Sequence, residues 1–377
     1  MSDGKVIPTV LLAGGGSGGH VYPLVAVADA IKKIEPQVRI VFVGTERGIE
    51  KQAVPARGYE LELVDVQPIR GRGFVGALRG VGGALASLPE SLRLVQRLQP
   101  RAVLTVGGYA AGPISAAARI QRIPIALLEP NAVMGLANRL MAPFVDRAYT
   151  AFALAERHFS AQKVLRSGVP IRAGFEPSAL CLGERPKRIL VLGGSQGART
   201  LNESLPPAMG RQTLPIRVRH QCGKADVKRV AERYRAVGIA EAEIVDFIDD
   251  MPAAIRDADL IISRSGASAV SEICAVGRAS LLVPYPFAAG NHQQKNAEAL
   301  FDVGAAHWLN NRDADASRLT DEIAALLQDS NLLTNMASAA RSIGRPHAAA
   351  CIAEDFLALA GFGRLTPEHG HEPKETN

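Results

Sequence analysis

Short, uninterrupted apolar runs alternate with helical patterns along the whole chain, and this alternation limits the fold more than any other feature of the sequence. Continuous apolar runs are typical of strands that are buried on both faces. Such runs occur at residues 9–13, 39–44, 60–66, 102–108, 124–130, 188–194, 216–221, 243–248, 258–266 and 278–286. Strands of this kind that are separated by helices form parallel sheets, so the sequence predicts an α/β fold.

The pattern starts again near the middle of the chain. An apolar strand, a glycine-rich turn and the start of a helix follow one another at residues 9–20 and again at residues 188–200. The 377 residues exceed one ordinary hydrophobic core and fit two domains of roughly 150 to 200 residues. We expect two Rossmann-like domains, residues 1–167 and 168–345, whose parallel sheets face each other across a cleft. The glycine- and proline-rich segment 166–187 would contain the boundary between them.

Composition excludes several classes of function. Apolar residues make up 47% of the chain and charged residues 21%, as in a globular protein. The net charge of +6 permits an anionic partner such as a nucleotide or an acidic membrane surface. Aromatic residues are scarce, at 5%, so we expect no nucleic-acid partner. The four cysteines form no CxxC pair, which argues against a zinc site or a disulfide framework and fits a reducing cytosol.

Local composition also predicts the relation to a membrane and one disordered segment. No apolar stretch is long enough to cross a bilayer, so we expect no membrane span. Residues 366–377 contain no apolar side chain and should form a disordered tail.

The first glycine-rich turn contains the pattern GxGxxG at Gly14, Gly16 and Gly19. A nicotinamide-binding domain also requires an acidic residue at the end of its second strand, roughly 20 residues further on. The second strand here ends in VFVGT, and Glu46 comes late. An NAD-dependent dehydrogenase is therefore kept only as an alternative.

The same turn places Ser17, Gly18, Gly19 and His20 at the N-terminus of the next helix. Backbone amides and the helix dipole at such a position favour an anion, for example a diphosphate. The dipole also disfavours the imidazolium form, so we expect a neutral His20 that accepts a proton as a general base. The alternative is a histidine that only hydrogen-bonds to the backbone.

Two more glycine-rich turns follow predicted strands. They lie at residues 106–113, with Tyr109, and at residues 193–199, with Ser195. Three such turns at the carboxyl ends of strands in two domains indicate a cleft lined for phosphate and other polar ligand groups.

Polar residues near two later helix starts complete the predicted site, namely Glu272, Gln293, Gln294 and Asn296. Glu272 either accepts hydrogen bonds from ribose hydroxyls or complements a helix dipole. The three neutral amides are suited to sugar hydroxyls, although helix caps use the same residue types. The Asp-x-Asp pairs at 257–259 and 313–315 lie at the amino end of a strand and at a helix start, so we expect no metal and no other cofactor.

The segment 67–89 combines basic and apolar side chains and contains no acidic residue. Its predicted membrane-contacting residues are Arg70, Arg72, Phe74, Val75, Leu78 and Arg79. Such a segment can lie on an anionic bilayer without spanning it. A core-packing helix preceded by a glycine-rich loop is the alternative.

Taken in order, these motifs resemble those of the MurG family, bacterial UDP-N-acetylglucosamine transferases of peptidoglycan synthesis. The matching segments are GGGSGGHVYP, IRGRG, VGGYAAGP, GGSQGAR, FIDDM, RSGASAVSE and HQQKNA, which span nearly the whole chain. The resemblance implies the GT-B fold, in which a C-terminal helix, here within residues 346–365, returns to the N-terminal domain. It also implies an inverting glycosyltransferase that moves N-acetylglucosamine from UDP to the C4 hydroxyl of the muramyl sugar of lipid I, giving lipid II, without a metal.

The resemblance implies roles for individual residues as well. His20 would be the catalytic base, with Glu129 as second choice and Tyr109 close to the reacting sugars. The implied substrate-binding residues are Ser17, Gly18, Gly19, Asn131, Arg172, Ser195, Ile248, Ala267, Ser268, Ala269, Val270, Ser271, Glu272, Gln293, Gln294 and Asn296.

Within this set, Ser195 would touch the diphosphate, and Arg172 and Ile248 would flank the nucleoside. The chain departs from the family at Ala269, where a threonine is usual, and the neighbouring Ser268 is the candidate to replace that hydroxyl.

Two other functions stay open: a different GT-B transferase acting on a lipid or small-molecule acceptor, and a nucleotide-sugar sensor without turnover. The implied partners are UDP-N-acetylglucosamine, an undecaprenyl-linked muramyl-peptide acceptor and an anionic membrane surface. The expected location is peripheral, on the cytoplasmic face of the cell membrane.

Overall fold

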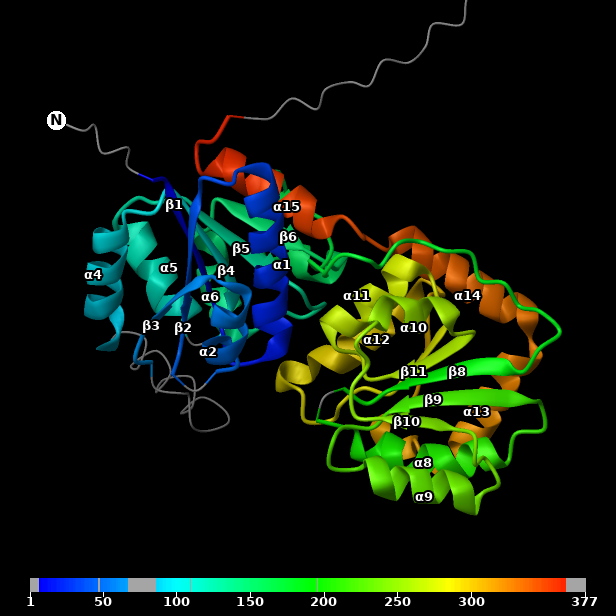
Figure 1. Ribbon diagram of the computed structural model, residues 1–377. Helices are drawn as coiled ribbons and strands as arrows, with labels where there is room; N and C mark the ends of the chain where they lie inside the picture. The colour runs from blue at the N-terminus through cyan, green and yellow to red at the C-terminus, as the bar shows by residue number, and fades with distance from the viewer. Residues whose placement is uncertain (1–6, 47, 67–85, 109, 195, 364–377) are drawn as a thin grey trace, which may run out of the picture.

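The computed structural model describes residues 7–363 except 47, 67–85, 109 and 195 (Figure 1). The predicted tail and the predicted membrane-contacting residues Arg70 to Arg79 therefore lie outside the described residues, as do Tyr109 and Ser195. The described chain forms two α/β halves, each built on one parallel sheet.

The sheet of the first half has seven strands in the order β3-β2-β1-β4-β5-β6-β7. The strands are β1 (Thr9–Gly14), β2 (Arg39–Gly44), β3 (Glu60–Leu63), β4 (Val103–Gly107), β5 (Ile125–Glu129), β6 (Arg147–Thr150) and β7 (Val164–Leu165). The helices are α1 (Gly18–Ile34), α2 (Glu50–Ala53), α4 (Leu88–Leu98), α5 (Ala111–Ile120), α6 (Leu136–Met141) and α7 (Ala153–Glu156), with the 3₁₀ helices η1 (Pro55–Arg57), η2 (Ala142–Phe144) and η3 (Ala161–Lys163).

Alternate side chains of β1 explain why its sequence is apolar throughout. Val10 and Leu12 pack on one face of the sheet, in a cluster that contains residues of α1. Leu11 and Ala13 pack on the other face, with residues of α4 and α5. Both faces are covered, as expected for a parallel sheet.

The sheet of the second half has six strands in the order β10-β9-β8-β11-β12-β13. They are β8 (Lys187–Leu192), β9 (Ile216–Gln221), β10 (Glu243–Val245), β11 (Leu260–Ser263), β12 (Ser280–Leu282) and β13 (His307–Trp308). The helices are α8 (Arg199–Gly210), α9 (Val227–Ala236), α10 (Met251–Asp257), α11 (Ala267–Val276), α12 (His292–Asp302), α13 (Ala316–Gln328) and α14 (Ser330–Ile343), with the 3₁₀ helices η4 (Ala289–Asn291) and η5 (Asn311–Asp313).

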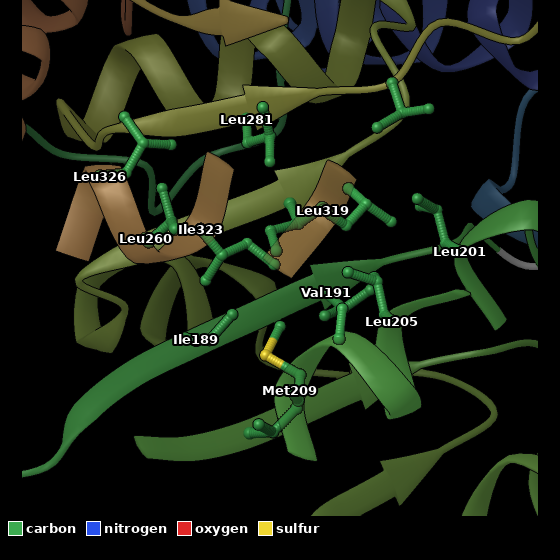
Figure 2. Packing of buried hydrophobic residues seen from close by; sticks show 14 of the residues in the cluster. Ile189, Val191, Leu201, Leu205, Met209, Leu260, Leu281, Leu319, Ile323 and Leu326 are labelled. Carbon is green, nitrogen blue, oxygen red and sulfur yellow. The ribbon is translucent and has the colours of Figure 1, made fainter. Parts of the chain in front are cut away.

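The core on one face of this second sheet joins strands and helices that are distant in sequence. Figure 2 shows Val191 of β8, Leu205 of α8 and Ile323 of α13 converging in one cluster, in which all three side chains are fully buried. These two parallel sheets confirm the predicted fold class. Three short strands, β6, β7 and β13, were not predicted, because they do not lie within the longer apolar runs from which the strands were inferred.

The last helix, α15 (Ala348–Leu359), leaves the second half and packs on the first. Ile352 and Phe356 are fully buried in the cluster that contains the α1 side chains. Asp355 adds polar contacts, because it accepts hydrogen bonds from Arg147 Nε at 2.8 Å and from the Tyr149 hydroxyl at 2.9 Å. This helix is therefore part of the core of the first half.

Replacing Phe356 by alanine should test that contribution. The substitution leaves a cavity between α15 and α1, so the free energy of unfolding should fall by about 3 to 5 kcal/mol. Denaturant titration followed by circular dichroism measures the change. The control Glu354→Ala, at an exposed position of the same helix, should shift it by less than about 0.5 kcal/mol; equal effects of both substitutions would show that α15 is not part of the core.

Candidate functional site

Three loops of the first half meet because β1, β4 and β5 are neighbours in a parallel sheet and end at the same edge. The turn after β4 packs directly on the turn after β1: a Cβ atom on Gly108 would lie 2.6 Å from Gly15 O. Loops at the carboxyl edge of such a sheet are the usual place for a ligand.

The first turn leads into α1 without a side-chain cap. Ser17 is the N-cap residue, and its side chain makes no capping hydrogen bond. Gly16 has a φ of +91° with nothing near its missing Cβ, so glycine is needed there for its backbone conformation. The first N–H groups of an α-helix, here including those of Gly18 and Gly19, have no carbonyl partner within the helix. They can therefore donate to an anion.

His20 lies on the first turn of α1, and its Nδ1 is 3.1 Å from Gly15 O. A carbonyl oxygen can only accept, so Nδ1 carries the proton and Nε2 keeps a lone pair in the neutral ring. Burial lowers the pKa of His20, and the positive charge of His292 on α12 of the second half lowers it further. Both effects favour the neutral ring, and the cause found here is burial, whereas the prediction from sequence used the helix dipole.

Glu129 ends β5 and is buried. Burial raises its pKa to about 7, against the opposing effect of several donors. Its Oε1 accepts from Asn131 N at 3.1 Å, and its Oε2 accepts from Asn138 Nδ2 at 2.9 Å. Sequence reasoning missed Asn138, because a single asparagine on a short helix gives no local signal of its partner.

Asn131 and Asn296 join the two halves at this edge. Asn296 Nδ2 donates to Asn131 Oδ1 at 3.2 Å and to Ser265 O at 3.1 Å, while its Oδ1 accepts from Ala132 N at 2.8 Å. Asn296 is fully buried. Its polar atoms bridge α12 to the loop after β5, and contact with the donor sugar stays a prediction.

The start of α11 forms the corresponding part of the second half. Its N-cap is Gly266, which has no side chain to cap the helix. Ser268 Oγ is buried and has no hydrogen-bond partner within the described residues. Free amides beside an unsatisfied hydroxyl can bind phosphate oxygens.

Glu272 lies further along α11, with its Oε1 3.9 Å from Arg172 Nε. Burial raises the pKa of Glu272 to about 7, and Arg172 opposes this rise. The Arg172 guanidinium also lies 5.7 Å from the Phe175 ring centroid. Ile248 is buried in the core beside these residues, so any nucleoside contact at that position would come from its backbone.

The remaining α11 residues are divided between core and cavity. Ala267 and Val270 are buried, whereas Ala269 is partly exposed. Ser271 lines a cavity of about 570 Å³ between the halves, together with Phe152 and Lys295.

The glutamines at the start of α12 have different surroundings. Gln293 Oε1 accepts from Tyr285 N at 2.9 Å, and Gln293 O accepts from Ser265 Oγ at 2.8 Å. Gln294 Nε2 donates to Glu298 at 2.8 Å on the same helix. Gln293 is therefore fixed next to the N-terminus of α11, whereas Gln294 lies along α12.

A buried polar network behind the third glycine turn was not recognised in the sequence. Asn202 Nδ2 donates to Cys222 O at 2.9 Å and to Asp226 at 2.7 Å, so Asn202 Oδ1 must accept from His220 Nε2, 3.1 Å away. His220 Nδ1 then accepts from the Tyr234 hydroxyl at 3.2 Å. The network holds the loop whose Cys222 O would lie 2.3 Å from a Cβ on Gly197.

The carboxylates set aside as metal ligands have structural partners. Asp259 binds Arg185 through two hydrogen bonds of 2.6 and 2.8 Å, and Asp315 caps α13 by accepting from Arg318 N. Within the part of the chain that the structure describes, no group of three His, Cys, Asp or Glu side chains is placed to hold a metal ion. None of the described helices is long and apolar enough to cross a membrane.

Comparison with known proteins gives matches over both halves. The family model for the glycosyltransferase family 28 N-terminal domain matches residues 10–150, and that for the family 28 C-terminal domain matches residues 188–352. A Sorangium cellulosum (strain So ce56) protein is 47% identical over 93% of this chain and 88% of its own length. It is named UDP-N-acetylglucosamine--N-acetylmuramyl-(pentapeptide) pyrophosphoryl-undecaprenol N-acetylglucosamine transferase.

Further similarities agree with this match. A protein of the same name from Syntrophus aciditrophicus (strain SB) is 39% identical over 93% of this chain and 98% of its own length. The crystal structure of Acinetobacter baumannii MurG has a TM-score of 0.80 and 30% identity, covering 93% of this chain and 99% of that one. These comparisons confirm the predicted GT-B fold and the resemblance to the MurG family.

The His220 network predicts a specific loss of stability in acid. Burial lowers the pKa of His220 to about 3, so between about pH 6.5 and pH 3 the unfolded chain binds a proton that the folded chain does not. Within that window, each unit by which the pH falls should lower the free energy of unfolding by about 1.4 kcal/mol. His220→Gln should lose this term, so denaturant titrations at pH 6.5 and 4.5 should show the stabilities of the two proteins converging; parallel curves would contradict the assignment.

Proposed function

The chain belongs to glycosyltransferase family 28, and we propose that it transfers N-acetylglucosamine from UDP to the C4 hydroxyl of the muramyl sugar of lipid I, which produces lipid II. The observation that carries this proposal is the 47% identity to a transferase of that name over 93% of the chain. The alternative of another GT-B transferase has no comparable support. We assign the donor to the second half and the acceptor to the first.

The start of α11 supports the donor assignment. The helix start after Gly266 has no side-chain cap, and the Ser268 hydroxyl has no hydrogen-bond partner among the described residues; both suit the diphosphate of UDP. Glu272, next to Arg172, would accept hydrogen bonds from the ribose hydroxyls. Ser195 would add a diphosphate contact on grounds of sequence alone.

The start of α12 supports the assignment of the donor sugar. Gln293 is held by Ser265 and Tyr285 beside the start of α11, so its remaining amide hydrogens can bind a sugar attached to that diphosphate. Asn296 would act from behind, since it holds Asn131 of the first half. The sugar would then lie between the halves, with its C1 atom toward the first glycine turn.

His20 is the base that we assign to the reaction. The C4 hydroxyl oxygen of the muramyl sugar attacks C1 of N-acetylglucosamine, the bond from C1 to the diphosphate oxygen breaks, and the proton passes to His20 Nε2. In-line attack inverts the configuration at C1. Backbone amides at the helix starts stabilise the charge that develops on the departing UDP.

Glu129 is less suited to that role, although its pKa of about 7 fits a proton acceptor. Both of its oxygens already accept hydrogen bonds, from Asn131 and Asn138. We infer that Glu129 holds Asn131 in place. Tyr109 stays a predicted neighbour of the reacting sugars.

The acceptor is lipid-linked, so we also propose that the protein contacts the cytoplasmic face of the cell membrane. Segment 67–89 is one predicted contact. A second is the face of α6 and η2 that exposes Leu136, Leu140 and Phe144, four residues apart in sequence. Positive charge lies beside it: burial lowers the pKa of His158, and the nearby guanidinium groups of Arg139 and Arg157 add to that decrease.

Replacing His20 by alanine should separate catalysis from binding. Loss of the base should lower kcat by roughly 10²- to 10⁴-fold, with the affinity for UDP-N-acetylglucosamine changed little. Transfer of radiolabelled sugar to a lipid I analogue measures kcat, and calorimetry measures affinity. His347→Ala, at the exposed N-cap of α15, is the control and should behave as wild type; normal turnover by His20→Ala would leave Glu129 as the candidate base.

The double variant Leu140→Ser, Phe144→Ser should weaken membrane attachment at least about 10-fold, since each side chain contributes apolar area that a bilayer would bury. Sedimentation with phosphatidylglycerol-rich vesicles measures attachment, and turnover of a short-chain, water-soluble acceptor should persist. Val303→Ser removes a similarly exposed apolar side chain of the second half and is the control.

Replacing Arg70, Arg72 and Arg79 by glutamate tests segment 67–89 in the same sedimentation assay. Vesicle binding that neither this triple variant nor the double variant changes would refute both contacts.

A further inference from the structure

Glu50 is a buried carboxylate at the start of α2, and neither the family resemblance nor the reaction described above gives it a role. Its side chain is 1% exposed. Its Oε1 accepts from Thr45 N at 2.8 Å and from Thr45 Oγ1 at 3.1 Å, and its Oε2 accepts from Gly16 N at 2.9 Å. Within the described residues, no lysine or arginine forms an ion pair with it. The donors to Glu50 among the described residues are thus all neutral, and a carboxylate buried among neutral donors is costly, which points to a specific use.

Three glycines from different segments make room for this one side chain. A Cβ atom added to Gly15 would lie 2.2 Å from the Glu50 carboxylate, and one added to Gly48 would lie 1.9 Å from it. A Cβ atom added to Gly44 would lie 2.3 Å from Glu50 Cγ. Part of the glycine content of the first turn therefore serves the Glu50 carboxylate and not a ligand. The hydrogen bonds to Thr45 and Gly16 hold the Glu50 carboxylate inward, whereas the acidic residue of a dinucleotide-binding domain binds a ribose.

The peptide group between Gly15 and Gly16 connects Glu50 to His20. Its N–H belongs to Gly16 and donates to Glu50 Oε2, and its C=O belongs to Gly15 and accepts from His20 Nδ1 at 3.1 Å. A peptide group is planar and trans, so its N–H and C=O point in opposite directions. Glu50 and His20 thus hold the two sides of one rigid group.

We propose that Glu50 is a positioning residue for His20, acting through the Gly15–Gly16 peptide group. This inference rests on the proposed role of His20 as base. The carboxylate fixes the plane of the peptide, and its negative charge polarises the amide, which makes Gly15 O a stronger acceptor. The His20 Nδ1–H bond to that oxygen then holds the ring in the tautomer whose Nε2 faces the reacting sugars. The arrangement corresponds to a base oriented by a third group, with a peptide inserted between carboxylate and imidazole.

Glu50→Gln tests the proposal. A glutamine has one acceptor oxygen and one amide nitrogen, so it cannot accept from both Thr45 N and Gly16 N. We expect kcat to fall about 10- to 100-fold, the range for losing one hydrogen bond to a charged group. The KM for UDP-N-acetylglucosamine should change less than about 3-fold. Asp259→Asn, which alters a carboxylate of similar burial in the second half, controls for loss of stability, with both melting temperatures measured.

A double-mutant cycle with His20→Ala separates the possible explanations. If Glu50 acts through His20, Glu50→Gln should cost almost nothing more once the imidazole is absent. Equal losses in both backgrounds would overturn the proposal, because Glu50 would then act only on the loop. Normal turnover by His20→Ala alone would instead refute His20 as the base. The cycle separates these two results, because it measures each single variant as well as the double variant.

A spectroscopic measurement keeps the test independent of activity. Long-range ¹H–¹⁵N correlations of ¹⁵N-histidine protein report the imidazole tautomer, and the His20 signals are those lost in His20→Ala. Wild type should show the Nδ1–H tautomer, and Glu50→Gln should increase the share of Nε2–H. An Nε2–H tautomer in wild type, or no change in the variant, would overturn the proposal. Thr45→Val removes only the hydroxyl donor to Glu50 Oε1 and should leave the tautomer unchanged.

Discussion

Backbone approaches backbone at the carboxyl edge of each sheet, and this contact determines the arrangement of the site. In the first half a Cβ on Gly108 would lie 2.6 Å from Gly15 O, and in the second half one on Gly223 would lie 2.6 Å from Gly197 N. Both halves therefore close the gap between neighbouring turns with glycine. The close approach brings helix starts and strand ends within reach of one ligand, which longer side chains at these positions would prevent.

The ionisable groups around these turns are held mainly by neutral partners. Glu129 accepts from asparagine side chains and backbone, and His220 is held by Asn202 and Tyr234. Neutral partners keep the pKa of each group under the control of burial, which raises that of Glu129 and lowers that of His220. In the proposed reaction, the charges that change are then those of the substrate's diphosphate and of the group that accepts the proton.

Local patterns in the sequence were enough to predict the fold and part of the site. The apolar runs and glycine turns are signals within a few residues, so both sheets and the helix start at His20 could be recognised. Glu50, Asn138 and His220 could not, because each depends on partners that the fold brings from elsewhere in the chain. The acidic residue associated with the first glycine turn proved to be Glu50 and not the late Glu46, since the chain after β2 turns back through α2.

The surroundings of Asn296 depend on how the two halves pack together. Its position at a helix start predicts a sugar contact, and three hydrogen bonds of its side chain go to the protein, two of them across the two halves. An amide on a helix start can serve a ligand or a neighbouring loop, and only the packing of the other half decides between them. That packing depends on residues more than 160 positions away in the chain.

The return of α15 to the first half has a consequence for how the protein is made. The cluster around α1 includes Ile352 and Phe356, which leave the ribosome only after the whole second half. At about 5 to 20 residues per second, the stretch from β7 to α15 takes roughly 10 to 40 s to synthesise. During that interval the first half has all seven strands of its sheet but lacks the helix that covers α1. Nascent chains of this length would present an apolar surface that the finished protein buries, and this is where a chaperone would be expected to act.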